Sequence, residues 1–217
     1  MAARYVTIGG RRVRVGSTLY KTWKAYEHAL AVLLGKKKRP LSRKTQLPHL
    51  VQHPSPNQSI RGAAIDLVVV HDTEGPYASA VNWFANTASQ VSAHVVLNED
   101  GTEATQCVPW SKKAWACVDF NPRSLNLEMA GKASVGYSPA EIQAAAAIVA
   151  YWCKLYKIPV RDAIGGHQSG ITFHQDLGVA GGGHHDPGWN ATQKAAFILK
   201  VKAVSEKGLS PRTWGHS

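Results

Sequence analysis

The sequence predicts an α/β fold in which a mixed central β-sheet is flanked by helices, preceded by a small basic ββα arm. Short apolar runs rich in β-branched residues alternate with segments of helical periodicity, which is typical of a sheet covered by helices. The charge also divides the 217-residue chain: residues 1–45 hold 12 of the 25 lysines and arginines but one of the 14 acidic residues. We therefore expect a basic arm and linker over residues 1–45, a main domain over residues 46–205 and a C-terminal tail over residues 206–217.

The arm begins with a pattern typical of a β-hairpin. Residues 5–15 alternate apolar and polar side chains around Gly9-Gly10, a two-residue turn. From Ser17 the apolar period changes to that of an amphipathic helix, which Gly35 can end. Three interpretations of its charge stay open. The arm docks on the main domain and its lysines are merely solvated, or it contacts an anionic cell-wall polymer or membrane surface, or it binds nucleic acid. No dedicated nucleic-acid signature accompanies the charge.

The main domain starts with a segment, residues 41–61, whose proline and polar content predicts linker and loop. Apolar periodicity then predicts the next elements in order. They are a buried strand over residues 65–70, a short helix over 77–86, a hairpin of strands 91–97 and 103–108, and a strand over 124–129 that carries Glu128.

Two helices and one strand complete the predicted domain. Ser138 and Glu141 form a capping box with a proline at the first helical position, so a helix begins there. A short strand over residues 171–173 leads into His174. Asn190 and Gln193 resemble a second capping box before the last helix, and the tail after residue 206 is expected to fray.

Composition excludes several classes of protein. No apolar run reaches 18 residues, so no transmembrane helix is expected. The first residues lack the apolar core of a secretory signal, so we expect synthesis in the cytoplasm without a signal peptide. Three cysteines without CxxC spacing favour free buried thiols, although a Cys107–Cys117 bridge stays open.

A glycine-rich segment over residues 170–189 carries three histidines and two aspartates. Imidazole nitrogens and carboxylate oxygens are usual zinc ligands, and a catalytic site uses three of them with a fourth position open. If this loop supplies two ligands, the best third donor is His71, at the end of the buried strand. His167 competes with His174 for one of these positions.

Five segments occur in order: HPSPNQS, IDLVVVHDTEG, SAHVVLNEDGT, NPRSLNLEMAG, and GITFHQDLG followed by HHDPGWN. Together they resemble the type 2 N-acetylmuramoyl-L-alanine amidases, the zinc amidases of phage endolysins and cell-wall recycling, over about residues 46–205. The resemblance implies a Zn²⁺ site formed by His71, His174 and Asp186, with Glu128 as the catalytic glutamate. It also implies cleavage of the peptidoglycan amide between N-acetylmuramic acid and L-alanine of the stem peptide.

The chain departs from the family pattern at three positions. His184 stands two residues before the aspartate ligand, where a lysine usually assists the oxyanion, and we expect His184 to take that role. Ala93 stands where some members carry a tyrosine, and Ala116-Cys117 where a histidine often follows the tryptophan.

Substrate contacts are expected from Trp115, Asn121 and His94, with Trp110 as a further loop aromatic. The helical spacing of Trp83 and Trp152 predicts core positions instead.

The leading hypothesis is a peptidoglycan amidase, of the phage endolysin kind, that acts as a monomer on the bacterial wall after release from the cytoplasm. The rival hypothesis is a peptidoglycan-binding receptor of the same fold that has lost catalysis. A basic nucleic-acid-binding protein would depend on the arm alone, because residues 46–217 hold 13 basic and 13 acidic side chains.

Overall fold

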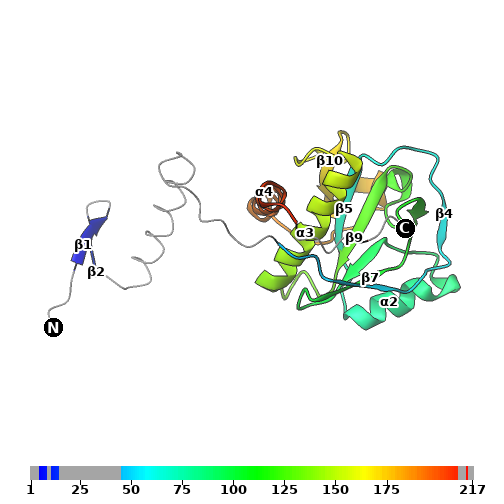
Figure 1. The fold of residues 1–217 in the computed structure, drawn as a ribbon, viewed down its shortest axis with the longest axis horizontal. Helices are drawn as coiled ribbons and strands as arrows, with labels where there is room; N and C mark the ends of the chain where they lie inside the picture. The colour runs from blue at the N-terminus through cyan, green and yellow to red at the C-terminus, as the bar shows by residue number, and fades with distance from the viewer. Residues whose placement is uncertain (1–4, 9–10, 15–44, 210–213, 215–217) are drawn as a thin grey trace. The chain divides into compact units, whose positions relative to one another are not determined.

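The computed structural model describes residues 5–8, 11–14, 45–209 and 214 (Figure 1). The chain forms two compact units, Met1–Arg43 and Lys44–Ser217. In the first unit, β1 (Tyr5–Ile8) and β2 (Arg11–Arg14) pair antiparallel. This pairing confirms the hairpin predicted around Gly9-Gly10, whereas the helix predicted from Ser17 lies outside the described residues.

The second unit contains a six-stranded mixed sheet, which confirms the predicted fold class. Its order is β10 (Gly170–Phe173), β5 (Leu67–Asp72), β9 (Ser124–Met129), β6 (Val95–Leu97), β7 (Glu103–Gln106) and β3 (His49–Gln52). The first four strands run parallel to one another, so their carboxyl ends meet at one edge. Strands β6 and β7 form the predicted antiparallel hairpin, and β3 runs parallel to β7.

Two long helices cover one face of this sheet (Figure 1). Helix α3 (Pro139–Tyr156) begins at the predicted cap, where the Ser138 side chain accepts a hydrogen bond from the Glu141 amide, but the reciprocal bond that would complete the predicted capping box is not formed. Helix α4 (Ala191–Lys207) begins with the predicted reciprocal capping box of Asn190 and Gln193. Both helices pack their apolar faces into one core with inward-facing residues of β5, β9 and β10.

The opposite face of the sheet carries the polar chemistry. Helix α2 (Tyr77–Ala85) packs Val81 and Phe84 against Val96 of β6. Next to it, Leu67 and Val69 of β5 pack against Leu177 in a separate small cluster. Side chains at alternate positions of β5 and β9 on this face therefore lie between two apolar patches.

The prediction that residues 41–61 form only linker and loop is wrong. Strand β3 lies within this segment, as does β4 (Gln58–Ile60), which pairs with β8 (Lys112–Ala114) in a small second sheet. These short strands carry few apolar side chains, because they lie at sheet edges where one side is open to solvent. Their pattern therefore did not distinguish them from loops.

The predicted fraying of the tail is also wrong at Trp214. Its indole is buried, stacks on Trp110 at 6.2 Å between ring centres, and donates from Nε1 to the Pro48 carbonyl at 3.1 Å. An amphipathic indole gains free energy from such burial when its N–H finds an acceptor. Trp214 thus ties the end of the chain to the main core.

The cysteines and the helices bear on the predictions about disulfides and membrane spans. Cys107, Cys117 and Cys153 are all buried free thiols, so the Cys107–Cys117 bridge is not formed. Within the described part of the chain, no helix combines the length and the apolar character needed to cross a bilayer.

Candidate metal centre

The candidate centre lies where parallel strands end. His71 is the second-last residue of β5 and lies opposite Glu128, the second-last residue of β9. His174 follows directly after the last residue of β10. Ligand sites of open parallel sheets occur outside the carboxyl ends of the strands, and the registers place these three residues at that edge.

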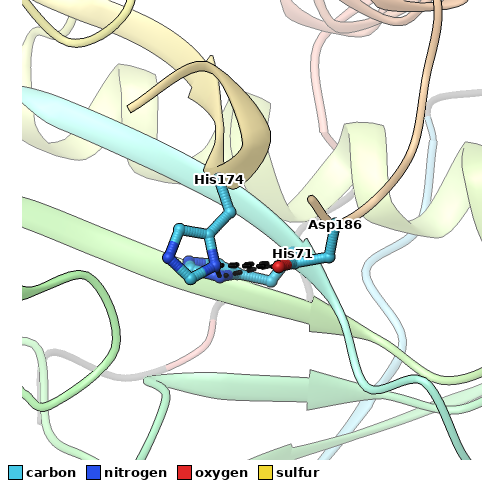
Figure 2. A group of neighbouring side chains, drawn as sticks. All are labelled: His71, His174 and Asp186. Atoms are coloured by element: carbon cyan, nitrogen blue, oxygen red, sulfur yellow. Dashed lines mark hydrogen bonds and ion pairs between the residues drawn. The ribbon is translucent and has the colours of Figure 1, made fainter. Parts of the chain in front are cut away.

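A loop from the last third of the chain completes the cluster. Figure 2 shows the Asp186 carboxylate pointing at both imidazoles. Its carboxylate lies 3.0 Å from His174 Nδ1 and 3.4 Å from His71 Nδ1, and the two Nδ1 atoms are 2.9 Å apart. The donor atoms of His71, His174 and Asp186 all lie within 4.8 Å of one another, so these residues could hold a metal ion.

Each imidazole uses its other nitrogen for a hydrogen bond to an oxygen. His71 Nε2 lies 3.0 Å from Asn126 Oδ1, and His174 Nε2 lies 2.9 Å from the Gly181 carbonyl. Both rings then carry the proton on Nε2 and point the Nδ1 lone pair at the other ring. Two lone pairs 2.9 Å apart repel each other unless a cation lies between them, so this donor set fits a divalent metal.

The loop that supplies the Gly181 carbonyl depends on a residue without a side chain. A Cβ built on Gly181 would lie 2.3 Å from the Leu177 Cβ, closer than any real contact of this kind. Glycine at this position therefore allows the backbone to pack against Leu177, where its carbonyl lies 2.9 Å from His174 Nε2.

Burial and charge set the protonation of the cluster. Burial, followed by the neighbouring His174 charge, lowers the pKa of His71, which favours the neutral imidazole that binds metal. Burial opposes ionisation of Asp186, but its interactions with His174 and His71 outweigh burial and lower the pKa of that carboxyl. These shifts favour a neutral His71 and an ionised Asp186, which are the forms of these two groups that bind a metal.

Glu128 is a buried carboxyl beside this cluster. Burial first, then the charges of Asp186 and Asp72, raise the pKa of Glu128 well above its ordinary value. Its Oε2 atom is buried without a hydrogen-bond partner. A buried acceptor without a partner carries a desolvation cost, and such groups concentrate at functional sites.

His184 lies on the solvent side of the cluster. Its ring stacks on His174 with 4.3 Å between centres and 15° between planes, and its Nδ1 lies 3.7 Å from the Asp186 carboxylate. Its side chain is 60% exposed, in contrast to the buried rings of His71 and His174. An exposed imidazole over the cluster can reach a bound substrate.

These residues open into a hollow of about 580 Å³. Its lining includes the polar residues His71, His174, His184, Asp186 and Glu128, which we call the ligand wall. The lining also includes Trp83, Phe84 and Trp115, which we call the aromatic wall.

The structure brings together the predicted ligands and separates the alternative. His71, His174 and Asp186 form the one cluster found among the described residues that could hold a metal, and His167 is not part of it. Glu128 and His184 line the same hollow, as does Trp115.

Other substrate-contact expectations are contradicted by burial. His94 has no exposed surface, and its Nδ1 accepts a hydrogen bond from the Asn126 amide, so His94 cannot touch a substrate. Trp110 is equally buried, against Trp152 and Trp214. Asn121 does not line the hollow; its Oδ1 accepts from the Ala116 and Cys117 amides and shapes a loop.

Trp83 corrects the sequence-based expectation in the other direction. Helical spacing predicted a core position, but Trp83 is 55% exposed and lines the hollow. Spacing identified the buried face of α2 through Val81 and Phe84, but Trp83, one residue before Phe84, lies off that face of the helix. Residue spacing alone could not show that this tryptophan is exposed beside a hollow.

An α/β domain that gathers two imidazoles and a carboxylate at the carboxyl ends of parallel strands defines a protein with a candidate metal site. A family model described as N-acetylmuramoyl-L-alanine amidase matches residues 61–189, which is more than half of the chain. The chain belongs to this family, as the sequence motifs predicted.

A curated relative is similar to this chain over part of its length. N-acetylmuramoyl-L-alanine amidase A of Achromobacter lyticus is 31% identical over 101 residues, which is 46% of this chain and 57% of that protein. The chain therefore spans a little over half the length of that relative.

Several solved structures are similar to this chain and support the fold. The structure of PlyL aligns with a TM-score of 0.53 at 24% identity, over 71% of this chain and 96% of that one. An AmpD derivative aligns with a TM-score of 0.55 at 25% identity, over 71% and 97%. AmiA of Staphylococcus aureus, in complex with its ligand, aligns with a TM-score of 0.58 at 16% identity, over 83% and 89%.

Proposed function

We propose that this protein is a zinc-dependent N-acetylmuramoyl-L-alanine amidase that hydrolyses the amide between N-acetylmuramic acid and L-alanine in peptidoglycan. The observation that carries this proposal is the convergence of three metal-binding side chains and a buried carboxyl in one hollow. Membership of the amidase family supports the choice of substrate.

His71, His174 and Asp186 would hold the zinc. Two imidazole nitrogens and one carboxylate oxygen form the ligand set of many catalytic zinc sites, in which a further position stays open. When bound, zinc supplies Lewis acidity that polarises a carbonyl oxygen and lowers the pKa of water.

Glu128 is the proposed general base and acid. It lines the hollow beside His71 and has an Oε2 atom free to accept a proton. It would take the proton of the attacking water and then deliver it to the amine nitrogen of the leaving L-alanine. A raised pKa suits this cycle, because a carboxyl that titrates nearer neutral pH can both accept and release the proton.

His184 is the proposed donor to the developing oxyanion. Its exposed ring lies over His174 at the solvent side of the cluster. A neutral imidazole can donate one N–H to the tetrahedral oxygen, so this residue can replace the lysine usual in the family.

The aromatic wall is the proposed contact for the substrate. Trp83 presents an exposed indole face, and Trp115 is held by a hydrogen bond from its Nε1 to Ser59 Oγ at 3.0 Å. Both line the hollow, so they would pack against the apolar faces of the muramyl sugar or the stem peptide.

The proposed role in the cell is lysis of the wall after release, of the phage endolysin kind. Membership of the amidase family supports the wall as the place of action. The basic arm, with 12 lysines and arginines in residues 1–45, would contact anionic wall polymer.

The test is hydrolysis of purified peptidoglycan with stoichiometric zinc, followed by detection of new L-alanine amino termini. Wild-type protein should release stem peptide, whereas His71→Ala and Glu128→Gln should not. Binding to the wall without any new amino terminus would instead identify a receptor of the same fold.

A further inference from the structure

A buried asparagine lies beneath the candidate metal centre. Asn126 occupies β9 two residues before Glu128, so its side chain lies on the same face of the sheet, opposite Val69 of β5. It has no exposed surface. A buried amide group must find partners inside the protein for its oxygen and its two N–H bonds.

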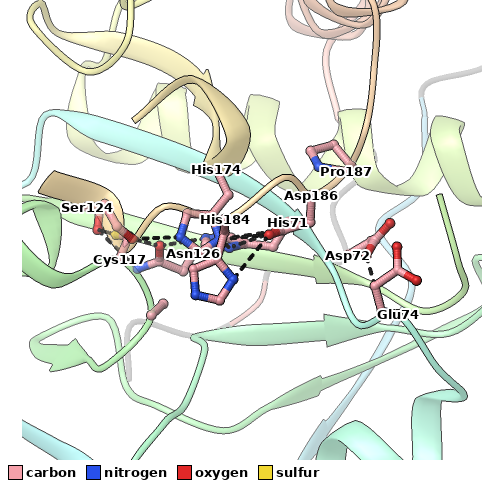
Figure 3. A network of polar contacts seen from close by, with 12 residues as sticks. His71, Asp72, Glu74, Cys117, Ser124, Asn126, His174, His184, Asp186 and Pro187 are labelled. Atoms are coloured by element: carbon pink, nitrogen blue, oxygen red, sulfur yellow. Dashed lines mark hydrogen bonds and ion pairs between the residues drawn. The ribbon is translucent and has the colours of Figure 1, made fainter. Parts of the chain in front are cut away.

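The partners of Asn126 fix which way its amide points. Nδ2 donates to Ser124 Oγ at 3.0 Å, which leaves Oδ1 as the atom facing the metal cluster. Oδ1 accepts from the Cys117 thiol at 3.2 Å and lies 3.0 Å from His71 Nε2 (Figure 3). The main-chain N–H of Asn126 donates to His94 Nδ1 at 3.0 Å and fixes the backbone as well.

This orientation determines the state of His71. Because Oδ1 can only accept, the His71 ring must donate from Nε2, and in the neutral ring its Nδ1 is left without a proton. That nitrogen is the atom that faces His174 Nδ1 at 2.9 Å and the Asp186 carboxylate at 3.4 Å. A hydrogen bond at the remote nitrogen of a metal-binding imidazole sets the tautomer and the ring orientation and raises its basicity.

We propose that Asn126 is a positioning residue that holds His71 in the Nε2-protonated tautomer and so prepares its Nδ1 to bind metal. Ser124 and Cys117 keep the amide in the required orientation. The inference rests on the metal site proposed above, but the tautomer of His71 can be measured in the metal-free protein, without zinc.

The primary test is the tautomer of His71 in metal-free wild-type protein, measured by long-range proton–nitrogen NMR with nitrogen-15 histidine. His71→Gln identifies the signals by their loss. We expect a ring protonated on Nε2, and a ring protonated on Nδ1 would overturn the proposal, whatever the behaviour of the variants.

Variants of Asn126 then test the consequence for metal. Asn126→Ala should lose the single tautomer and weaken zinc binding about 10–100-fold, measured by competition with a chromogenic chelator. Asn126→Asp keeps an acceptor oxygen and should restore the Nε2-protonated ring. Unchanged zinc affinity in folded Asn126→Ala would contradict the positioning role.

Asn57→Ala is the matched control. Asn57 is also buried, and its Nδ2 donates to Asn86 and Val91 carbonyls away from His71, so its loss costs comparable hydrogen bonds. Asn57→Ala should leave zinc affinity unchanged. A fall equal to that of Asn126→Ala would instead show that the loss of affinity comes from general destabilisation. Wild-type protein that binds no zinc would refute the proposed function and still leave the tautomer measurement decisive for Asn126.

Discussion

The ligand wall and the aromatic wall of the same hollow differ in how exposed their side chains are and in what holds them. His71 and His174 are buried, and each has a hydrogen-bond acceptor behind its ring. On the aromatic wall, Trp83 is 55% exposed, on a helix at the border of the hollow. In the proposed function, the reacting groups would therefore be held in place before substrate arrives, whereas the binding surface would stay open to a polymer.

This difference follows from the elements that supply each wall. Adjacent parallel strands fix neighbouring side chains through backbone registers, which place His71 beside Glu128. Helix α2 contacts the sheet through Val81 and Phe84, so Trp83, which lies off that face of the helix, is free to face solvent. In the proposed function, the strands would thus fix the groups that carry out the chemistry, and the exposed apolar area of α2 would contact the substrate.

Removing a metal ligand from the ligand wall should have the largest effect on zinc binding and turnover. His71→Ala, His174→Ala or Asp186→Ala should abolish zinc binding and reduce turnover by more than the about 10²–10⁴-fold of a lost acid–base group. Metal analysis of the purified variants measures this directly. His167→Ala is the control and should keep its zinc; loss of metal in that variant would refute the ligand assignment.

The next largest effect is expected at Glu128. Glu128→Gln keeps the volume of the side chain but cannot accept the water proton, so kcat should fall about 10²–10⁴-fold. Zinc content should stay at the wild-type level, which separates this effect from the loss of a ligand. Wild-type turnover in the glutamine variant would exclude Glu128 as the base.

Loss of His184 should lower kcat by as much as loss of Glu128, or by less. His184→Ala removes the proposed oxyanion donor, and loss of such a donor costs about 2.7–4 kcal/mol, or about 10²–10³-fold in kcat. Zinc should remain bound, because His184 lies outside the cluster of three ligands. His184→Lys introduces the residue usual in the family and should retain most of the activity; equal losses in both variants would count against the donor role.

The aromatic wall should give a smaller effect of a different kind. Trp83→Ala should raise KM about 2–10-fold, since an aromatic contact contributes about 0.5–1.5 kcal/mol, with kcat nearly unchanged. Trp83→Phe keeps a ring and should lie between the alanine variant and wild type. A fall in kcat at constant KM would assign Trp83 to the chemistry instead.

The smallest effect concerns a carboxyl outside both walls. Burial raises the pKa of Glu141, at the start of α3, from 4.5 to about 8. Between these values the unfolded chain releases the proton and the folded protein keeps it, so this group makes stability fall as pH rises. Glu141→Gln should therefore raise the melting temperature more at pH 8 than at pH 5; parallel curves would contradict the shift.

Some of the site was predictable because its residues stand in local patterns with physical meaning. His71 and His174 each follow a short apolar strand segment, and a buried strand end is a fixed point for a ligand. The helix starts at Ser138 and Asn190 were also predictable, because capping depends on residues within one turn.

Other parts of the site depended on contacts that no local pattern contains. Neither the burial of His94 nor the exposure of Trp83 follows from its neighbours in the chain. Each depends on which distant residues cover that position: His94, just before β6, lies against Arg61 and Trp110, and Trp83 lies off the face of α2 that packs.

The sequence by itself determined the mixed α/β architecture, the family and the three side chains that gather around one point. These follow from periodicity, capping and motifs, all of which are written within short segments. Only the tertiary structure decided that Asn126 stands behind His71, and that Asp186 reaches both imidazoles. Those relations depend on strand register and loop path, which bring together residues that lie far apart in the chain, as His71 and His174 do.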